Sequence, residues 1–141
     1  FLAEHPWPQT RDRGGDPVDL SQIGPPDPTA MEKVFTDRLS AGWAALDTGS
    51  SEQFVAMTFD SAMVPFVGVA AMRGGWPESG QPSSSVILEP CTGWPDRLDI
   101  AIPRGAAMTI PGKTTVRWRI AMHLGRGRTA LDAAIASASM P

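Results

Sequence analysis

Short apolar runs separated by proline and glycine follow one another along most of this chain. The sequence contains fourteen residues of each of these two types, a punctuation that is typical of all-β domains rather than helical ones. Strands are predicted at 33–39, 42–47, 53–60, 65–72, 84–90, 106–110 and 114–124. We therefore expect an all-β fold, an antiparallel β-sandwich.

Three of these runs carry more detailed predictions. Runs 53–60 and 65–72 are apolar on both faces, which is typical of central strands that are covered on each side. In run 114–124, Trp118 and the apolar residues spaced two apart from it alternate with Arg and His residues. One face of this strand should pack in a core, while His123 on the other face meets solvent or a groove. Trp43, inside another predicted strand, is likewise expected in the core.

Few other stretches show a clear preference. Residues 95–102 and 129–139 are compatible with short helices, and Thr129 is a possible cap for the second. Residues 11–30 are rich in Pro, Gly and Asp and are expected to form an extended surface loop. The pair Pro111-Gly112 predicts a tight hairpin turn, because proline fixes φ and glycine accepts a positive φ.

Composition fits one soluble domain with a hydrophobic core. The 141 residues are 42% hydrophobic and 19% charged, and no apolar run approaches the roughly 20 residues that span a bilayer. The first residues show no basic segment followed by an apolar one, so a cytoplasmic location without a membrane partner is expected. A lone cysteine, Cys91, excludes an internal disulfide and agrees with a reducing compartment.

The balance of charge argues against nucleic acid as a partner. The net charge is −3, whereas binding to phosphates needs a basic face. Four arginines near the C-terminal end are expected to be solvated surface: Arg117, Arg119, Arg126 and Arg128. The sequence contains neither a Cys/His cluster with metal-ligand spacing nor a glycine-rich phosphate loop. We therefore expect no metal and no other cofactor.

Glu89 is the best candidate for chemistry. It follows the apolar run Val86-Ile87-Leu88 and precedes Pro90, which is expected to end the strand. Glu89 is therefore expected at the end of a largely buried strand. A carboxylate in such a place is held stiffly and is partly desolvated, which suits it to proton transfer. The same position can equally hold a structural ion pair, and the residues alone leave both interpretations open.

Several segments together resemble the C-terminal half of aldose 1-epimerase-like proteins, the galactose mutarotase-like family. The resemblance covers about residues 1–125 and leaves 126–141 as a C-terminal tail or short helix. No piece is diagnostic alone, but their order is fairly specific. The matching pieces are Glu4-His5-Pro6, Pro65-Phe66-Val67-Gly68-Val69, Gly74-Gly75-Trp76-Pro77, Leu88-Glu89-Pro90-Cys91-Thr92-Gly93-Trp94-Pro95-Asp96, and Pro111-Gly112 with Val116-Arg117-Trp118.

This resemblance implies an enzyme that interconverts the anomers of an aldohexose or its phosphate. Carried over by motif, Glu89 is the general base and His5 the general acid, while Glu32 is a looser counterpart of an acidic residue that holds sugar hydroxyls. Trp76 and Trp94 are candidate platforms for the apolar face of a sugar, although both can also be structural anchors. His123 is a poor match for the acid. Two alternatives remain, a carbohydrate-binding module without turnover and an interaction domain in which Glu89 is structural.

The implied fold is a supersandwich of about twice this length, so the chain is expected to be a partial domain. Its first residue is Phe1 rather than Met, which agrees with a fragment. The arginine and the first histidine that the family contributes from its N-terminal half have no counterpart here. A missing half would leave an apolar sheet face and strand edges open, which favour association. We therefore expect a dimer or a companion chain.

Overall fold

The computed structural model describes residues 3–12, 14–49, 52–77, 79, 81 and 83–139. Strands hold 35% of the described residues and helices 12%, which confirms the predicted all-β, sandwich-like class. Two compact units are present. The first comprises Phe1–Val34 and Val69–Ile87, and the second comprises Phe35–Gly68 and Leu88–Pro141.

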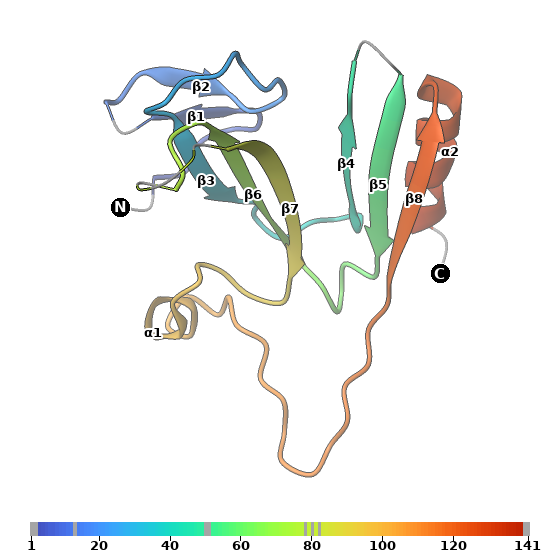
Figure 1. Ribbon diagram of the computed structural model, residues 1–141. Coiled ribbons are helices and arrows are strands. Elements are labelled where there is room, and N and C mark those ends of the chain that lie inside the picture. Colours follow the sequence, from blue (N-terminus) through green and yellow to red (C-terminus); the bar gives the residue numbers. More distant parts are fainter. Residues whose placement is uncertain are drawn as a thin grey trace. The chain divides into compact units, whose positions relative to one another are not determined.

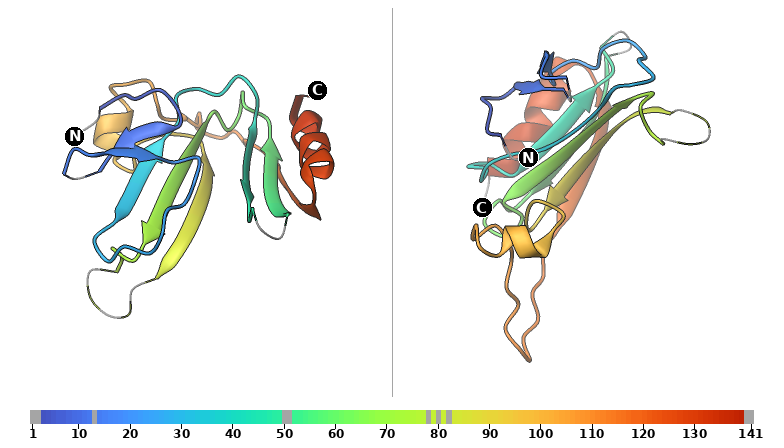
Figure 2. Two further views of the ribbon diagram at one scale, coloured as in Figure 1. Left: turned by 90° about the horizontal axis from the view of Figure 1, so that it is seen from above. Right: turned by 90° about the vertical axis from the view of Figure 1, so that its left-hand side faces the viewer.

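The described strands form three sheets, with β4-β5-β8 and β3-β6-β7 as the larger two and β1-β2 as a small ladder. Figures 1 and 2 show the strands of each sheet side by side. In chain order the elements are β1 (Gln9–Arg11), β2 (Pro17–Asp19), β3 (Met31–Phe35), β4 (Trp43–Asp47), β5 (Gln53–Phe59), β6 (Phe66–Arg73), β7 (Ser84–Cys91), α1 (Leu98–Ala101), β8 (Ile120–Arg126), α2 (Arg128–Ala136) and the 3₁₀ turn η1 (Ser137–Ser139).

Strand β6 is the centre of the β3-β6-β7 sheet. It is buried at every position from Phe66 to Met72, so the prediction of a central strand at 65–72 is confirmed. Backbone hydrogen bonds join its two ends to the flanks of β3 in antiparallel order. Thr36 N–H donates to Val67 O at 2.9 Å, and Arg73 N–H donates to Ala30 O at 3.1 Å.

The second unit contains the β4-β5-β8 sheet, in which β5 is central and both neighbours are antiparallel to it. Helix α2 packs on one face of this sheet and buries Leu131 against Phe54 and Ala56. The partly buried Ala45, Ala134 and Ile135 complete this core. Because most of these side chains are small, the helix can approach the sheet closely, and the predicted helix at 129–139 is confirmed as α2. It begins after Gly127, so Thr129 is not its cap.

The prediction for the last strand was wrong in its orientation. Ile120, Met122 and Leu124 are 40%, 65% and 77% exposed, whereas His123 lies on the face that pairs with the Ala56 row of β5. There His123 shares a hydrogen bond of 2.9 Å with the hydroxyl of Thr58. The covered face is the one whose small residues accommodate α2, not the one with the larger apolar side chains.

Residues 106–119 contain no strand, so the predicted strand at 106–110 and the hairpin are both wrong. Figure 1 shows this segment as a long loop between α1 and β8. It turns at Pro111, whose carbonyl accepts a hydrogen bond from the Thr114 hydroxyl. The positive φ of 60° falls on Lys113 rather than on the glycine before it. No neighbouring strand pairs with this segment, so its local preference for extended structure produces no ladder.

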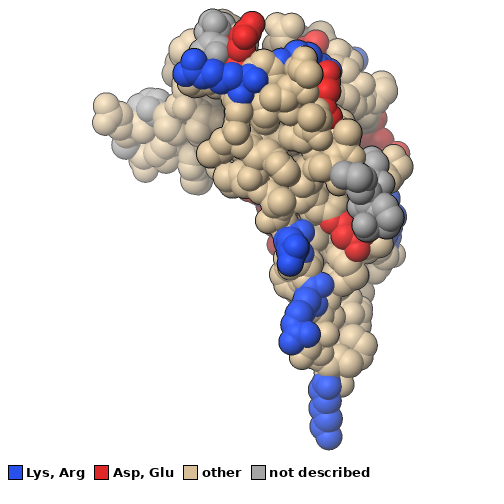
Figure 3. Space-filling model, turned by 90° about the vertical axis from the view of Figure 1, so that its right-hand side faces the viewer, with Lys and Arg blue, Asp and Glu red and all other residues tan. Residues whose placement is uncertain are grey.

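Other expectations for the surface were mixed. Trp43 and Trp118 are 41% and 52% exposed, so their prediction as core residues was wrong. The loop expected at 11–30 contains β2, which pairs with β1 through Thr10 opposite Val18, while the helix expected at 95–102 is reduced to the four residues of α1. The four C-terminal arginines are all exposed, as expected. On the face in Figure 3, the Lys and Arg side chains form several separate groups, and those at the top lie beside Asp or Glu side chains.

No helix within the described part of the chain is long and apolar enough to cross a membrane.

Candidate functional site

Glu89 lies near the end of β7, half-buried, above the backbone of Gly68 on the neighbouring strand β6. A Cβ atom built on Gly68 would lie 2.9 Å from Glu89 Oε2 and 3.4 Å from Glu89 Cβ. These distances place the glutamate side chain in the space that any other residue at position 68 would fill. The structure places Glu89 partly buried and near the end of a strand, as the sequence predicted. The strand itself is not largely buried, because β7 lies at the edge of its sheet and each of its residues is exposed or half-buried.

An aromatic wall adjoins this carboxylate. Phe35, at the end of β3, has its Cε1 atom 3.1 Å from the same Cβ position at Gly68. Its ring stacks on Trp94, with centroids 6.4 Å apart and planes at 21°. Trp94 in turn meets the buried ring of Phe66 edge-on at 6.2 Å. Glu89 and Trp94, the predicted base and a candidate platform, thus both lie near the ring of Phe35.

Two arginines border the same aromatic cluster. The guanidinium of Arg38 lies 5.1 Å from the Phe66 ring centroid, and that of Arg104 lies 5.5 Å from the Trp94 centroid. Arg38 also donates a hydrogen bond of 3.3 Å to the carbonyl of Gly105, which follows Arg104 directly. Both side chains are exposed at their ends, so they add positive charge beside the rings and help to orient them through cation–π contacts.

The loop that carries Trp94 is held by its backbone. Trp94 N–H donates to the carbonyl of Ala106 at 2.9 Å. A shallow cavity of about 220 Å³ lies on this loop, lined among others by Thr92, Asp96 and Met108. Pockets for small ligands usually enclose about 300–1,000 Å³, so this cavity is too small to be the main site by itself. It is better described as a recess beside the wall.

Cys91 closes the strand two residues after Glu89. Burial raises the pKa of its thiol, and backbone hydrogen bonds from Gly93 and Gly68 partly oppose this rise. The nearby carboxylates of Glu89 and Asp96 raise the pKa by smaller amounts. The thiol is therefore protonated at neutral pH and is not an activated nucleophile.

The predicted acid His5 lies in the first unit, exposed and ahead of β1 in a segment without regular structure. Glu89 belongs to the second unit. The pairing of the two as acid and base stays a prediction that rests on the resemblance.

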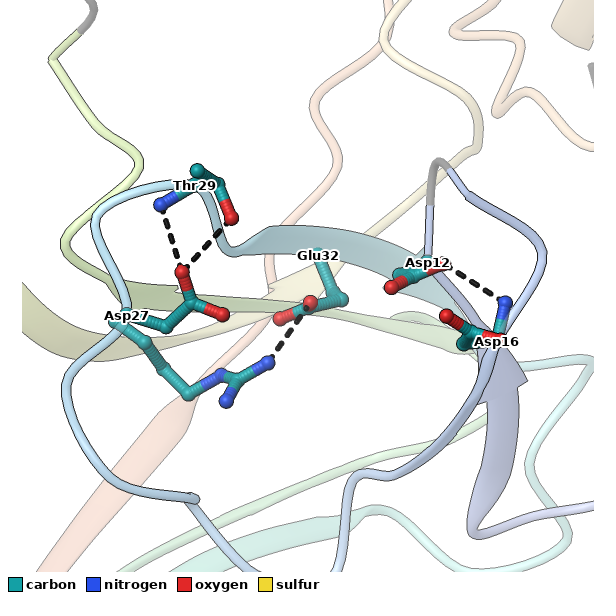
Figure 4. A network of polar contacts seen from close by, with 6 residues as sticks. Asp12, Asp16, Asp27, Thr29 and Glu32 are labelled. Atoms are coloured by element: carbon teal, nitrogen blue, oxygen red, sulfur yellow. Dashed lines mark hydrogen bonds and ion pairs between the residues drawn. The ribbon is translucent and has the colours of Figure 1, made fainter.

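Glu32 lies on β3 in the first unit, and its side chain is only 4% exposed. Its Oε1 pairs with the Arg73 guanidinium at 3.4 Å, as Figure 4 shows, while Oε2 has no hydrogen-bond partner among the described residues. This arrangement gives Glu32 a structural partner that the sequence did not reveal. Its role in holding sugar hydroxyls stays a prediction.

Other carboxylates in Figure 4 stabilise turns. Asp27 accepts two hydrogen bonds of 2.8 Å from the backbone N–H and hydroxyl of Thr29, and these bonds lower the pKa of Asp27. Asp12 accepts a backbone hydrogen bond of 2.9 Å from Asp16. Among the described residues, no group of three or more His, Cys, Asp or Glu side chains could hold a metal ion.

Trp76 is 47% exposed and lies in the first unit, directly after two glycines. A Cβ on Gly75 would lie 2.8 Å from the carbonyl oxygen of Ala30, so the glycine is needed for close backbone packing at this point. The carbonyl of Trp76 accepts hydrogen bonds from the backbone N–H and hydroxyl of Ser83. The backbone of this motif has a structural role, and the exposed indole remains a candidate platform.

No protein-family model, curated protein or solved structure matches this chain.

Sequence reasoning missed the neighbours that define the surroundings of Glu89. Phe35 and Arg38 lie close together in the chain, but Arg104 is far from both, and nothing in the local pattern indicates that the three meet. Gly68 did carry a signal, because an isolated glycine inside a buried strand often marks a close approach of another group.

Proposed function

We propose that this chain forms part of an aldose 1-epimerase-like enzyme that interconverts the anomers of an aldohexose or its phosphate. The observation that carries the proposal is the half-buried Glu89 carboxylate beside the Phe35–Trp94 stack. A carboxylate adjoining partly exposed aromatic rings offers both a proton acceptor and a face for the C–H bonds of a pyranose. The proposal includes a cytoplasmic location, which the single cysteine supports, and no role for a cofactor.

In the proposed reaction, Glu89 takes the proton from the C1 hydroxyl while an acid protonates the ring oxygen. The C1–O5 bond breaks, C1 becomes a carbonyl, and rotation about C1–C2 exposes its other face. Closure reverses both proton transfers. His5 is the proposed acid on the strength of the resemblance alone. Each positioned acid or base contributes about 10²–10⁴ to the rate.

The partner expected from the resemblance is a half-domain, supplied by a preceding segment or by a companion chain. The exposed row of Ile120, Met122 and Leu124 on β8 supports this part of the proposal. Exposed apolar side chains in a row are unfavourable in water and usually mark a surface that another segment covers.

The test is polarimetry of freshly dissolved α-glucose and α-galactose with the full-length protein, with each 6-phosphate as a second substrate. Glu89→Gln should lower the acceleration of mutarotation by about 10²-fold or more. Glu52→Gln, the same change at an exposed carboxylate in the second unit, should leave the rate unchanged. A folded Glu89→Gln variant with the wild-type rate would remove Glu89 from the mechanism.

The second candidate is a carbohydrate-binding module, favoured by the exposed Trp76 and by the stacked Trp94. Calorimetric titration with the same sugars separates the two. Binding without any acceleration of mutarotation supports the module. If there is neither binding nor acceleration, both candidates fail and an interaction domain with a structural Glu89 remains.

A further inference from the structure

Gly68 is distinctive because of what occupies the space above its backbone. It is the only described residue of β6 that lacks a side chain, and the other residues of this strand are apolar up to Met72. A Cβ at this position would lie 2.9 Å from Glu89 Oε2 and 3.1 Å from Phe35 Cε1. A separation under about 3.0 Å is closer than carbon and oxygen atoms normally approach without a bond, so one of the groups would have to move.

The atom that would have to move is the reactive one. At Gly42, by comparison, a Cβ would lie 1.9 Å from the backbone carbonyl oxygen of Phe59, and a side chain there would disrupt the strand itself. At Gly68 the crowded atoms belong to the ends of two side chains, which can rotate away. A methyl group at position 68 is therefore compatible with the fold but not with the present position of the Glu89 carboxylate.

We propose that Gly68 is a positioning residue for Glu89: its bare backbone provides the space that the carboxylate shares with the ring of Phe35 and from which it faces the sugar. This inference rests on the proposed function, because it assigns Gly68 a role in the same reaction. Gly68 itself takes no part in the proton transfer. It acts by allowing the carboxylate to lie close to the backbone of β6. The alternation of side chains along β7 points Glu89 to this face of the sheet.

The direct test is Gly68→Ala in the full-length protein, measured by polarimetry with α-glucose and α-galactose. A displacement of about 1 Å in a reacting group can cost about 10²-fold in rate, so we expect kcat to fall by about 10- to 100-fold. Phe35 lies 3.1 Å from the same Cβ position and stacks on Trp94, so a shift of this ring changes KM, whereas withdrawal of the carboxylate lowers kcat. The fall in kcat is therefore the result that the positioning role predicts.

The matched control is Gly125→Ala on β8. There a Cβ would lie 2.7 Å from the ring of Phe54, so the crowding is similar but lies in the α2 core. This variant should lose stability and keep its kcat. If the two variants lose kcat equally, general disturbance of the fold explains the loss and the positioning role of Gly68 is wrong.

A rescue experiment separates positioning from mere stability. Glu89→Asp shortens the side chain by one methylene and withdraws the carboxylate from the new methyl group. Its effect on kcat should be at least about three-fold smaller in the Gly68→Ala background than in the wild-type background. Additive losses would contradict direct contact between the two positions.

Should Gly68→Ala fold poorly, the pair Phe35→Leu and Phe35→Leu/Gly68→Ala replaces it. Leucine lacks the ring atom at 3.1 Å, so the methyl group gains room on that side and still meets Glu89 Oε2. The double variant should have the lower kcat. If the single and the double variant both fold and have equal kcat values, the inference about Gly68 is wrong, but the proposed epimerase function stands. If the wild-type protein has no activity, the proposed function is wrong and this inference falls with it.

Discussion

Replacing Arg73 by methionine should destabilise the first unit markedly, because it leaves the Glu32 carboxylate buried without a cation. The guanidinium lies 3.4 Å from Oε1, and the Glu32 side chain is only 4% exposed. At an effective dielectric constant of about 20, this attraction amounts to about 5 kcal/mol before desolvation is counted. Removing one partner from a buried pair typically costs about 3–5 kcal/mol.

The expected net cost is smaller than these figures, about 2–4 kcal/mol. Arg73 keeps 19% of its side chain exposed, so solvent weakens the pair, and methionine retains much of the apolar contact of the arginine stem. The other carboxylate oxygen, Glu32 Oε2, has no hydrogen-bond partner among the described residues. Without Arg73 neither oxygen would have its partner, and this raises the cost. Urea unfolding gives the global free energy of unfolding, and hydrogen exchange at β3 and β6 gives the local one.

Two further variants make this prediction sharp. In Arg73→Met/Glu32→Gln the charge that lost its partner is gone, so the double variant should regain at least about 1 kcal/mol relative to Arg73→Met. Arg97→Met breaks the exposed pair between Arg97 and Asp99 and should cost less than about 1 kcal/mol. If Arg73→Met costs no more than Arg97→Met, the burial of Glu32 does not depend on its ion pair.

Two other measurements address the second unit. Alkylation of Cys91 by iodoacetamide should rise at a higher pH than for an unfolded cysteine, because burial raises the pKa of the native thiol. Because the native thiol has the higher pKa, its protonated form stabilises the fold at pH values below the unfolded pKa of about 8.5. This stability is lost as the pH rises through the native pKa. An alkylation profile that coincides with that of the unfolded chain would contradict the prediction. Leu131→Ala should cost about 2–5 kcal/mol and speed hydrogen exchange throughout α2, since Leu131 is the buried residue that joins this helix to Phe54. If hydrogen exchange in α2 is unchanged in the Leu131→Ala variant, contacts other than that of Leu131 hold the helix.

Strand positions were predictable wherever both faces of a strand were apolar. Run 65–72 became β6 with its ends shifted by one residue, because a strand buried on both sides needs no information about which face is covered. The last strand lacked that advantage. Its alternation predicted two different faces correctly, but only the Ala-rich helix α2, folded onto Phe54 and Ala56, decides that the face with His123 is the covered one.

The candidate site was predictable only as far as a single strand reaches. Glu89 could be found because its carboxylate follows an apolar run and precedes a proline. Its contact with Gly68 depends on the register between β6 and β7, and the stack of Phe35 on Trp94 depends on the path of the loop after β7. Neither the register nor the path of the loop can be predicted from the local sequence pattern.

The two carboxylates proposed for the site, Glu32 and Glu89, differ in their burial and in their surroundings. Glu32 is buried, and Arg73 neutralises it; such a pair rigidifies a sheet but offers no proton acceptor to a ligand. Glu89 is half-buried beside an aromatic stack, in a space that exists only because position 68 is glycine. A carboxylate that exchanges a proton with a substrate must be accessible to it, and Glu89 is less buried than Glu32. Substitution of Gly68 therefore tests whether the position of the Glu89 carboxylate in this space matters for the proposed reaction.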